Sequence, residues 1–496
     1  MELFIVGVML VGTVAGAIGF GRTKRRNANV ADWALGGRSM GTLLFWFMNA
    51  GEVYTTFAVL GISGYAWALG APAYLAFCSV SLSYSIGYWL MPKIWRAGRL
   101  RHLVTQADFF AARYSAPWLG VLAGIVGIGA LIVYVQIQLI SLGLIVSLTL
   151  GGQISPTLSV AIAGLIMVAF VMFAGLRSAA FAAAVKDIMM LVLVGFLCFT
   201  IARQVGAASM FDVLRIAEEM HPGFGKLPGI DPSAPTTPIW LMTSALNVAL
   251  GNWVFPHLFQ VSYTANSATT IRRNAIWQPI YSLSFFFIIL LGIAALVAGT
   301  QPPDGNMNAA FLQFVSDKYP AWVVGIVAGT GFLLALAPGS VLLLTASAVF
   351  SRNVLLPLRP QTSDRAGLLA SRIALVAFAA LAVWLALSQK GSLVAILLAA
   401  YSAIGMLAPG VFLGFLWRGT TAIGVMAGIL TGFVILLVPS VTALFEGIFI
   451  NWEIGLVALA VNFIVTAGVS LATRKPDRQG QDVAFAQTAA DARVQN

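Results

Sequence analysis

Charged side chains are scarce in this sequence: Asp, Glu, Lys and Arg make up only 9% of the 496 residues, whereas 59% are hydrophobic and the mean hydropathy is +0.92. So little polar surface cannot cover a soluble globule, and the composition predicts a polytopic membrane protein. A sizeable soluble domain is also missing, since the longest loop, 202–237, is rich in Pro and Gly. No GxxxxGK[ST] motif occurs, so ATP-driven transport has no support.

Cysteine is nearly absent, with only Cys78 and Cys198 present. Both lie within apolar stretches, with no CxxC spacing and no neighbouring His, so we expect neither a disulfide nor a metal site and interpret both as packing residues. No predicted span contains the hydrolase motifs HExxH or GxSxG or a convincing pair of carboxylates. We therefore expect no enzyme.

Long apolar runs are abundant instead. Each contains about 18 or more residues, which as a helix is enough to cross roughly 30 Å of hydrocarbon. We expect thirteen transmembrane spans. Their approximate extents are 2–20, 39–65, 71–91, 118–149, 157–175, 181–201, 238–256, 277–299, 321–350, 369–388, 392–416, 420–440 and 452–472.

The net charge of +11 reflects membrane topology and not a nucleic-acid partner. With the N-terminus outside, 23 of the 28 Lys and Arg residues fall in inner loops and inner helix ends, and 5 fall in outer loops. This asymmetry predicts an outer N-terminus and a cytoplasmic C-terminus. The basic run RTKRR follows the first apolar run, which therefore predicts a retained anchor. We assign Lys186 to an inner helix end and expect no Lys or Arg deep within a span.

The stretch NAGEVYTTFAVLGISG, Asn49 to Gly64, interrupts the second apolar run with polar residues. A carboxylate at the centre of a membrane helix costs about 2.5–3.5 kcal/mol on translocon-based scales, so Glu52 should face protein or a water-filled cavity. One role is structural, in a buried hydrogen-bond network. The other, which we favour, is to bind the coupling cation or take up a proton, because burial favours the protonated form of a carboxylate.

A second interruption, at Asn247, Gly251 and Asn252, falls in the seventh run. Each interrupted run opens a set of five spans, and five is odd, so the two sets must face opposite ways across the membrane. This pattern predicts an all-α membrane protein built on an inverted five-plus-five repeat, with the substrate site between the broken helices. The expected transporter domain covers 1–473, with repeats 39–201 and 238–416 and two further helices in 420–472; a disordered tail follows over 474–496.

Further polar residues lie within the predicted spans. Tyr134, Gln138 and Ser141 recur at spacings of four and three and share one helical face, which could line a substrate path or join two helices. His257 follows Pro256 near the inner surface. It could relay protons, although a lone interfacial His is more often solvated or capping.

A carboxylate substrate would have no deep cation to bind. The positive ends of the broken half-helices near Gly51 and Gly251 would hold it instead, with help from nearby hydroxyl, amide and aromatic side chains. The candidate substrate-binding residues are Asn49, Thr55, Thr56, Tyr134, Gln138, Asn252 and Trp253.

Several long motifs resemble those of the solute:sodium symporter family. They are AGEVYTTFAVLGISGYAWALGAPAYLAF, YWLMPKIWRAGRLRHLVTQADFFAARYSAPWLG, YVQIQLISLG, FPHLFQ, IRRNAIWQPIYS, SAVFSRNV and YSAIGMLAPGVFLGFLW. Within the family, AGEVYTTF, PHLFQ and RRNAIWQP are most similar to bacterial monocarboxylate permeases, and next to pantothenate permeases. The resemblance extends to about residue 472. It implies thirteen helices, an outer N-terminus and the LeuT-like inverted repeat.

The resemblance also implies a sodium site, whose backbone ligands fall on Gly51 and Tyr54. The family completes this site with adjacent hydroxyl residues on the ninth span, but here Ala337 and Pro338 occupy those positions and Ser340 is the nearest hydroxyl. Val261 also stands where many relatives have Arg. These departures make a proton, accepted by Glu52, a competitor to sodium. The expected cation-binding set is Gly51, Glu52, Tyr54 and Ser340.

These observations predict a secondary active transporter of the bacterial inner membrane. We expect it to import small monocarboxylates such as lactate, pyruvate or acetate by cation-coupled alternating access, with sodium or a proton as coupling ion and no other cofactor. The alternatives are a symporter for pantothenate, an amino acid or a sugar, and a membrane sensor domain. The expected partners are the small-molecule substrate and the lipid bilayer.

Overall fold

The computed structural model describes residues 1–22, 35, 38–151, 153–173, 176–388 and 391–474. These residues form a helical bundle without strands, and a single isolated β-bridge joins Met40 to Ala265. The predicted all-α fold class is confirmed. The predicted tail lies outside the described residues, apart from Arg474.

The helices follow the apolar runs of the sequence closely. In the first half they are α1 Glu2–Arg22, α3 Thr42–Gly51, η1 Phe57–Gly61, α4 Ile62–Leu69, η2 Ala71–Tyr74, α5 Leu75–Leu100, α6 Gln106–Tyr114, α7 Pro117–Thr149, α8 Pro156–Phe173 and α9 Leu176–Val205. In the second half they are α10 Asp212–Met220, α11 Pro238–Asn252, α12 Pro256–Thr264, α13 Ala268–Tyr281, α14 Ser284–Val297, η3 Pro303–Gly305, η4 Met307–Ala309, α15 Ala310–Lys318, α16 Ala321–Val349, η5 Phe350–Leu355, α17 Leu356–Leu358, α18 Asp364–Ser388, α19 Leu393–Gly405, α20 Ala408–Leu416, α21 Ala422–Leu437, α22 Pro439–Ile448 and α23 Ile454–Thr473.

The number of spans differs from the predicted thirteen. Within the described residues, six helical stretches are long and apolar enough to cross a membrane, or eight if each of two bent pairs counts as one span. The count of thirteen is therefore not confirmed. One reason is that a span broken in mid-membrane leaves segments too short to cross by themselves, such as α3 with 10 residues and α11 with 15.

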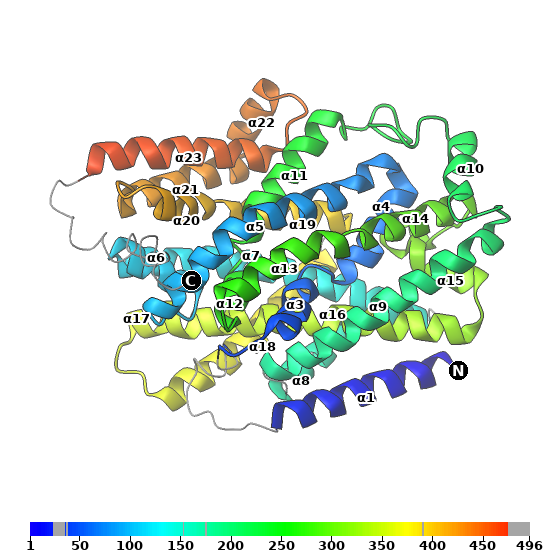
Figure 1. Ribbon diagram of the computed structural model, residues 1–496, viewed down its shortest axis with the longest axis horizontal. Helices are drawn as coiled ribbons and strands as arrows, with labels where there is room; N and C mark the ends of the chain where they lie inside the picture. Colours follow the sequence, from blue (N-terminus) through cyan, green and yellow to red (C-terminus); the bar gives the residue numbers. More distant parts are fainter. Residues whose placement is uncertain (23–34, 36–37, 152, 174–175, 389–390, 475–496) are drawn as a thin grey trace.

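The long helices run side by side along the long axis of the molecule (Figure 1). The N-terminus lies at the same end as α10 and α15, whereas α6 and α17 lie at the opposite end (Figure 1). This places the N-terminus on the same side as the long loop that contains α10, as the charge asymmetry predicts. Which of the two ends faces the outside stays a prediction.

Helix α16 occupies the centre of the bundle. It is apolar on all sides, and its most apolar 18-residue window is fully buried, which is the pattern of a helix surrounded by other helices. Helices α7, α9 and α1 pack against it. The first helix is therefore an integral part of the bundle, with its Ile5 and Met9 side chains seated against Gly325 and Gly329 of α16.

Candidate functional site

The first break lies where the sequence predicts it. Helix α3 ends at Gly51, the chain turns through residues 52–55, and η1 begins at Phe57. The Thr55 hydroxyl accepts a hydrogen bond from the Phe57 N–H (3.2 Å) and so satisfies a donor that has lost its helical partner. The Thr56 hydroxyl donates to Gln138 Oε1 on α7 (2.8 Å). These two hydroxyls stabilise the break and join it to the neighbouring helix.

The second break separates α11 from α12, between Asn252 and Pro256. Proline lacks an N–H and disfavours helical geometry at the residue before it, and Phe255 accordingly has an extended ψ of 134°. Asn252 Oδ1 accepts a hydrogen bond from the Tyr401 hydroxyl of α19 (2.9 Å), and the Trp253 indole donates to the Ser83 carbonyl of α5 (2.5 Å). Both candidate substrate residues are thus bonded to neighbouring helices.

Glu52 from the first break and His257 from the second lie next to each other. Glu52 Oε2 lies 3.9 Å from His257 Nε2, and both side chains are buried. This distance is beyond hydrogen-bond reach, and neither atom has a hydrogen-bond partner in the part of the chain that the structure describes. The His257 ring packs edge-on against Tyr134 and Phe255, with centroid distances of 5.9 and 5.3 Å. Because the His257 side chain is buried, the alternative of a solvated interfacial His is wrong.

A buried lysine lies beside the first break. The Lys186 ammonium donates to the Tyr54 carbonyl (2.8 Å) and to Asp187 Oδ1 (2.7 Å), and the Lys186 and Asp187 side chains are 0% exposed. The expectation that no Lys or Arg lies deep within a span is wrong. The apolar run suggested a span beginning near residue 181, but α9 begins at Leu176, so Lys186 lies about three turns into the helix.

The residues aligned with the family's sodium site provide few free oxygens. The Tyr54 carbonyl already accepts from Lys186, and the Ser340 hydroxyl donates to the Ala337 carbonyl within α16 (2.6 Å). Neither Ala337 nor Pro338 has a side-chain oxygen. The ammonium also fills the space beside Gly51, where an added Cβ would lie 3.4 Å from Lys186 Nζ. The groups present at this position do not fit a sodium ion.

A cavity of about 40 Å³ lies on the other side of the first break. A single water needs about 10–15 Å³, so the cavity holds about three waters or one small molecule. Its walls come from the break, α4, η2, α5, α7, α11, α14 and α19, and are apolar apart from a few hydroxyls. Those hydroxyls belong to Tyr65, Ser79, Tyr134 and Tyr401. The cavity has the size and the amphipathic lining of a site for a small organic solute.

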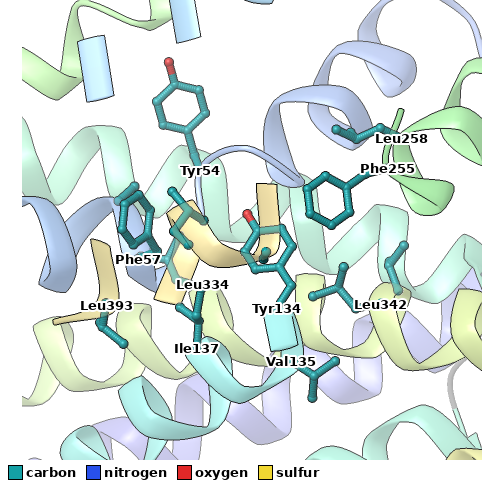
Figure 2. Close-up of a cluster of buried hydrophobic side chains, with 14 of the residues drawn as sticks. Tyr54, Phe57, Tyr134, Val135, Ile137, Phe255, Leu258, Leu334, Leu342 and Leu393 are labelled. Carbon is teal, nitrogen blue, oxygen red and sulfur yellow. The ribbon is translucent and has the colours of Figure 1, made fainter. Parts of the chain in front are cut away.

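Tyr134 is the candidate substrate residue that lines this cavity. It projects from α7 into a cluster of side chains from the first break and from the start of α12 (Figure 2), and its ring lies 5.5 Å from that of Phe255. Gln138, one turn further along α7, contacts Thr56 instead, and Asn49 is buried in α3. Sequence reasoning missed Tyr65 and Tyr401; a Tyr within an otherwise apolar run was the available signal for both.

A larger hollow of about 840 Å³ lies between α3, α9, α13 and α14. Its lining includes exposed apolar side chains, among them Leu43, Phe199 and Trp277. Side chains of this kind on the outside of a membrane bundle face lipid. The small cavity beside the first break is therefore the better candidate for a solute site.

The fold and the site define a multi-pass membrane transporter. A family model described as the sodium:solute symporter family matches residues 33–432. The chain is 34% identical to the uncharacterized symporter YhjB of Bacillus subtilis, over 97% of this chain and 99% of that protein. It is 28% identical to a monocarboxylate transport permease protein of Rhizobium johnstonii, over 71% and 69%.

Among solved structures, a Na⁺-coupled sialic acid symporter in its substrate-bound, outward-open state has the same fold. The TM-score is 0.76 with 14% identity, over 95% of this chain and 98% of that chain. The chain belongs to the sodium:solute symporter family. It is a cation-coupled solute transporter and not an enzyme, and the family resemblance seen in the motifs is confirmed.

Proposed function

We propose that this protein imports small monocarboxylates, such as lactate, pyruvate or acetate, across the bacterial inner membrane by alternating access. The observation that carries the proposal is the small cavity beside the first break. At about 40 Å³ it matches a two- or three-carbon acid better than the larger pantothenate or sugar molecules. The monocarboxylate permease of Rhizobium johnstonii among the relatives supports the same class of cargo.

The lining of the cavity suits a short acid with one apolar end. Apolar side chains such as Val248, Val394 and Leu397 can pack against a methyl group, while the Tyr134 hydroxyl can donate to a carboxylate. The Lys186 ammonium lies behind the break that forms one wall of the cavity. Its charge is paired with Asp187 at 2.7 Å, so Lys186 is a buried cation that the sequence-based account did not include, but it supplies no unpaired positive charge to the cavity.

Coupling requires that cation and substrate bind the outward-facing and inward-facing states with different affinities. We propose that the cation acts at the first break, in the region of Gly51, Glu52, Tyr54 and Ser340. Sodium and a proton are the two candidates, and the poor fit of these groups to sodium favours the proton. We also propose the orientation predicted by the charge asymmetry, with the N-terminus outside and the C-terminus in the cytoplasm.

The test is uptake of labelled pyruvate into proteoliposomes, first with an inward sodium gradient alone and then with an inward proton gradient alone. We expect accumulation above equilibrium under one of the two gradients, and competition by unlabelled lactate and acetate but not by pantothenate or glucose. Accumulation that pantothenate or a sugar inhibits and lactate does not would refute the proposed cargo.

Substitution of Ala76 by Phe should block uptake, because Ala76 lies on α5 in the wall of the cavity. Overpacking a buried site costs about 1–3 kcal/mol, and each 1.4 kcal/mol is tenfold in affinity, so we expect uptake to fall by roughly ten- to a hundredfold. Ala161 on α8 faces outward, and Ala161→Phe is the matched control that should transport normally. Initial rates at subsaturating pyruvate measure the difference. Equal rates for the two variants would place the substrate elsewhere.

A further inference from the structure

We propose that the Lys186 ammonium is a tethered cation in the place of a sodium ion, so that substrate binding and uptake by this protein do not require sodium. The inference rests on the proposed symport and narrows its coupling ion. The family name implies sodium as the coupling ion, whereas the groups present at the first break do not fit a sodium ion.

The ammonium occupies the position where a sodium ion would need oxygen ligands. Its Nζ lies 2.8 Å from the Tyr54 carbonyl, one of the two backbone groups that the family resemblance assigns to sodium. It also lies beside Gly51, the other of the two. An ammonium has three N–H donors and can satisfy the same carbonyl oxygens that a metal ion would. A sodium ion and the ammonium cannot occupy this space together.

The remaining ligands for sodium are also missing. Sodium is a hard cation that needs several oxygen ligands, as calcium and magnesium do. The α16 positions that the family resemblance assigns to hydroxyl ligands carry Ala337 and Pro338, which leaves Ser340, whose O–H donates within its own helix, as the nearest hydroxyl. The loss of the hydroxyl ligands and the presence of Lys186 are independent observations, and each removes a requirement for sodium.

One carboxylate pairs with the ammonium, and a second lies close to both. Asp187 on α9 pairs with it at 2.7 Å, and Glu52 in the break lies within electrostatic reach of both. The titratable groups that face Asp187 are the hydroxyls of Tyr54, Tyr84 and Tyr281, and those that face Glu52 are His257 and Tyr134. A second cation placed here would be repelled by Lys186 at short range in a dry interior. A sodium ion would therefore have to displace the ammonium to reach the Tyr54 carbonyl.

The first experiment uses the full-length protein and needs no substrate. Purified protein is tested for saturable ²²Na⁺ binding and for its melting temperature in sodium chloride against choline chloride at equal concentration. We expect no saturable binding and the same melting temperature in both salts. Saturable sodium binding by the unmodified protein would overturn the inference.

Removal of the ammonium should create a response to added cations. In Lys186→Ala the Tyr54 carbonyl and Asp187 lose their partner, which leaves a buried charge unpaired and lowers stability. Methylammonium at millimolar concentration should enter the vacated space and raise the melting temperature of Lys186→Ala. Lys318→Ala, which changes an exposed lysine at the end of α15, should show no such response.

A folded Lys186→Ala protein that methylammonium does not stabilise would contradict the tethered-cation role. If Lys186→Ala does not fold, the sodium measurements on the unmodified protein decide the inference.

Uptake separates this inference from the proposed function. Pyruvate accumulation that is equal in sodium-containing and sodium-free buffers supports both, and accumulation that requires sodium overturns the inference while leaving the monocarboxylate cargo intact. If no monocarboxylate accumulates under any gradient, the proposed function fails, and the sodium-binding measurement still decides the role of Lys186.

Discussion

Glu52→Gln should abolish accumulation of substrate while the protein stays folded and inserted. The change keeps the size of the side chain and removes its charge and its capacity to take up a proton. Glu52 Oε2 is buried without a hydrogen-bond partner among the described residues, so the carboxylate makes no bond at this atom that the amide would break. The measurement is the steady-state ratio of labelled pyruvate inside and outside proteoliposomes, which should fall to equilibration.

Glu453→Gln provides the matched control. Glu453 is a second buried carboxylate, but it accepts hydrogen bonds from the Leu456 N–H (2.9 Å) and the Ser402 hydroxyl (3.2 Å) at the start of α23. Its role is to cap a helix, and losing such a cap costs about 1 kcal/mol. Glu453→Gln should therefore melt at a lower temperature and still accumulate pyruvate. Full accumulation by well-inserted Glu52→Gln protein would reduce Glu52 to a structural role.

The positions of the two breaks could be predicted because they depend on local sequence. Polar and small residues at Asn49 and Gly51 interrupt one apolar run, and Pro256 ends another, so the chain cannot form a continuous helix at either place. The helix boundaries and the buried central helix follow from the same hydrophobic pattern. These features need no knowledge of which helix faces which.

The partners of each polar residue could not be predicted, because they depend on the rotation and tilt of whole helices. The contacts of Lys186 with Tyr54 and of Asn252 with Tyr401 join residues 132 and 149 positions apart. The extent of the apolar run also placed Lys186 too near a helix end, because α9 begins at Leu176, before the predicted span 181–201. The sequence therefore predicted where the two helices break and missed the buried lysine beside the first break.

Just beyond the first break, α4 packs very closely against α14 and η4. A Cβ added at Gly292 of α14 would lie 2.1 Å from the Ser63 carbonyl oxygen, and one added at Gly64 of α4 would lie 2.1 Å from the Met307 carbonyl oxygen. Both neighbours are backbone atoms and cannot turn aside. Small residues of this kind let membrane helices approach closely, and here they fix the second half of the broken helix.

Gly292→Ala should therefore be severely destabilising although it adds one methyl group. Overpacking usually costs about 1–3 kcal/mol, and a clash with backbone should reach or exceed the upper end of that range. Gly195→Ala in α9 is the matched control, because nothing lies within 4 Å of an added Cβ there, and Ala favours a helix over Gly by about 0.8–1.0 kcal/mol. Melting temperature and the yield of monodisperse protein should fall sharply for Gly292→Ala and hold or rise for Gly195→Ala.

Because α4 also lines the cavity through Ile62 and Tyr65, any Gly292→Ala protein that folds should lose pyruvate uptake as well. Normal stability and uptake in Gly292→Ala would show that α4 can move away from α14 without cost, and that the second half of the broken helix is not held where the structure places it.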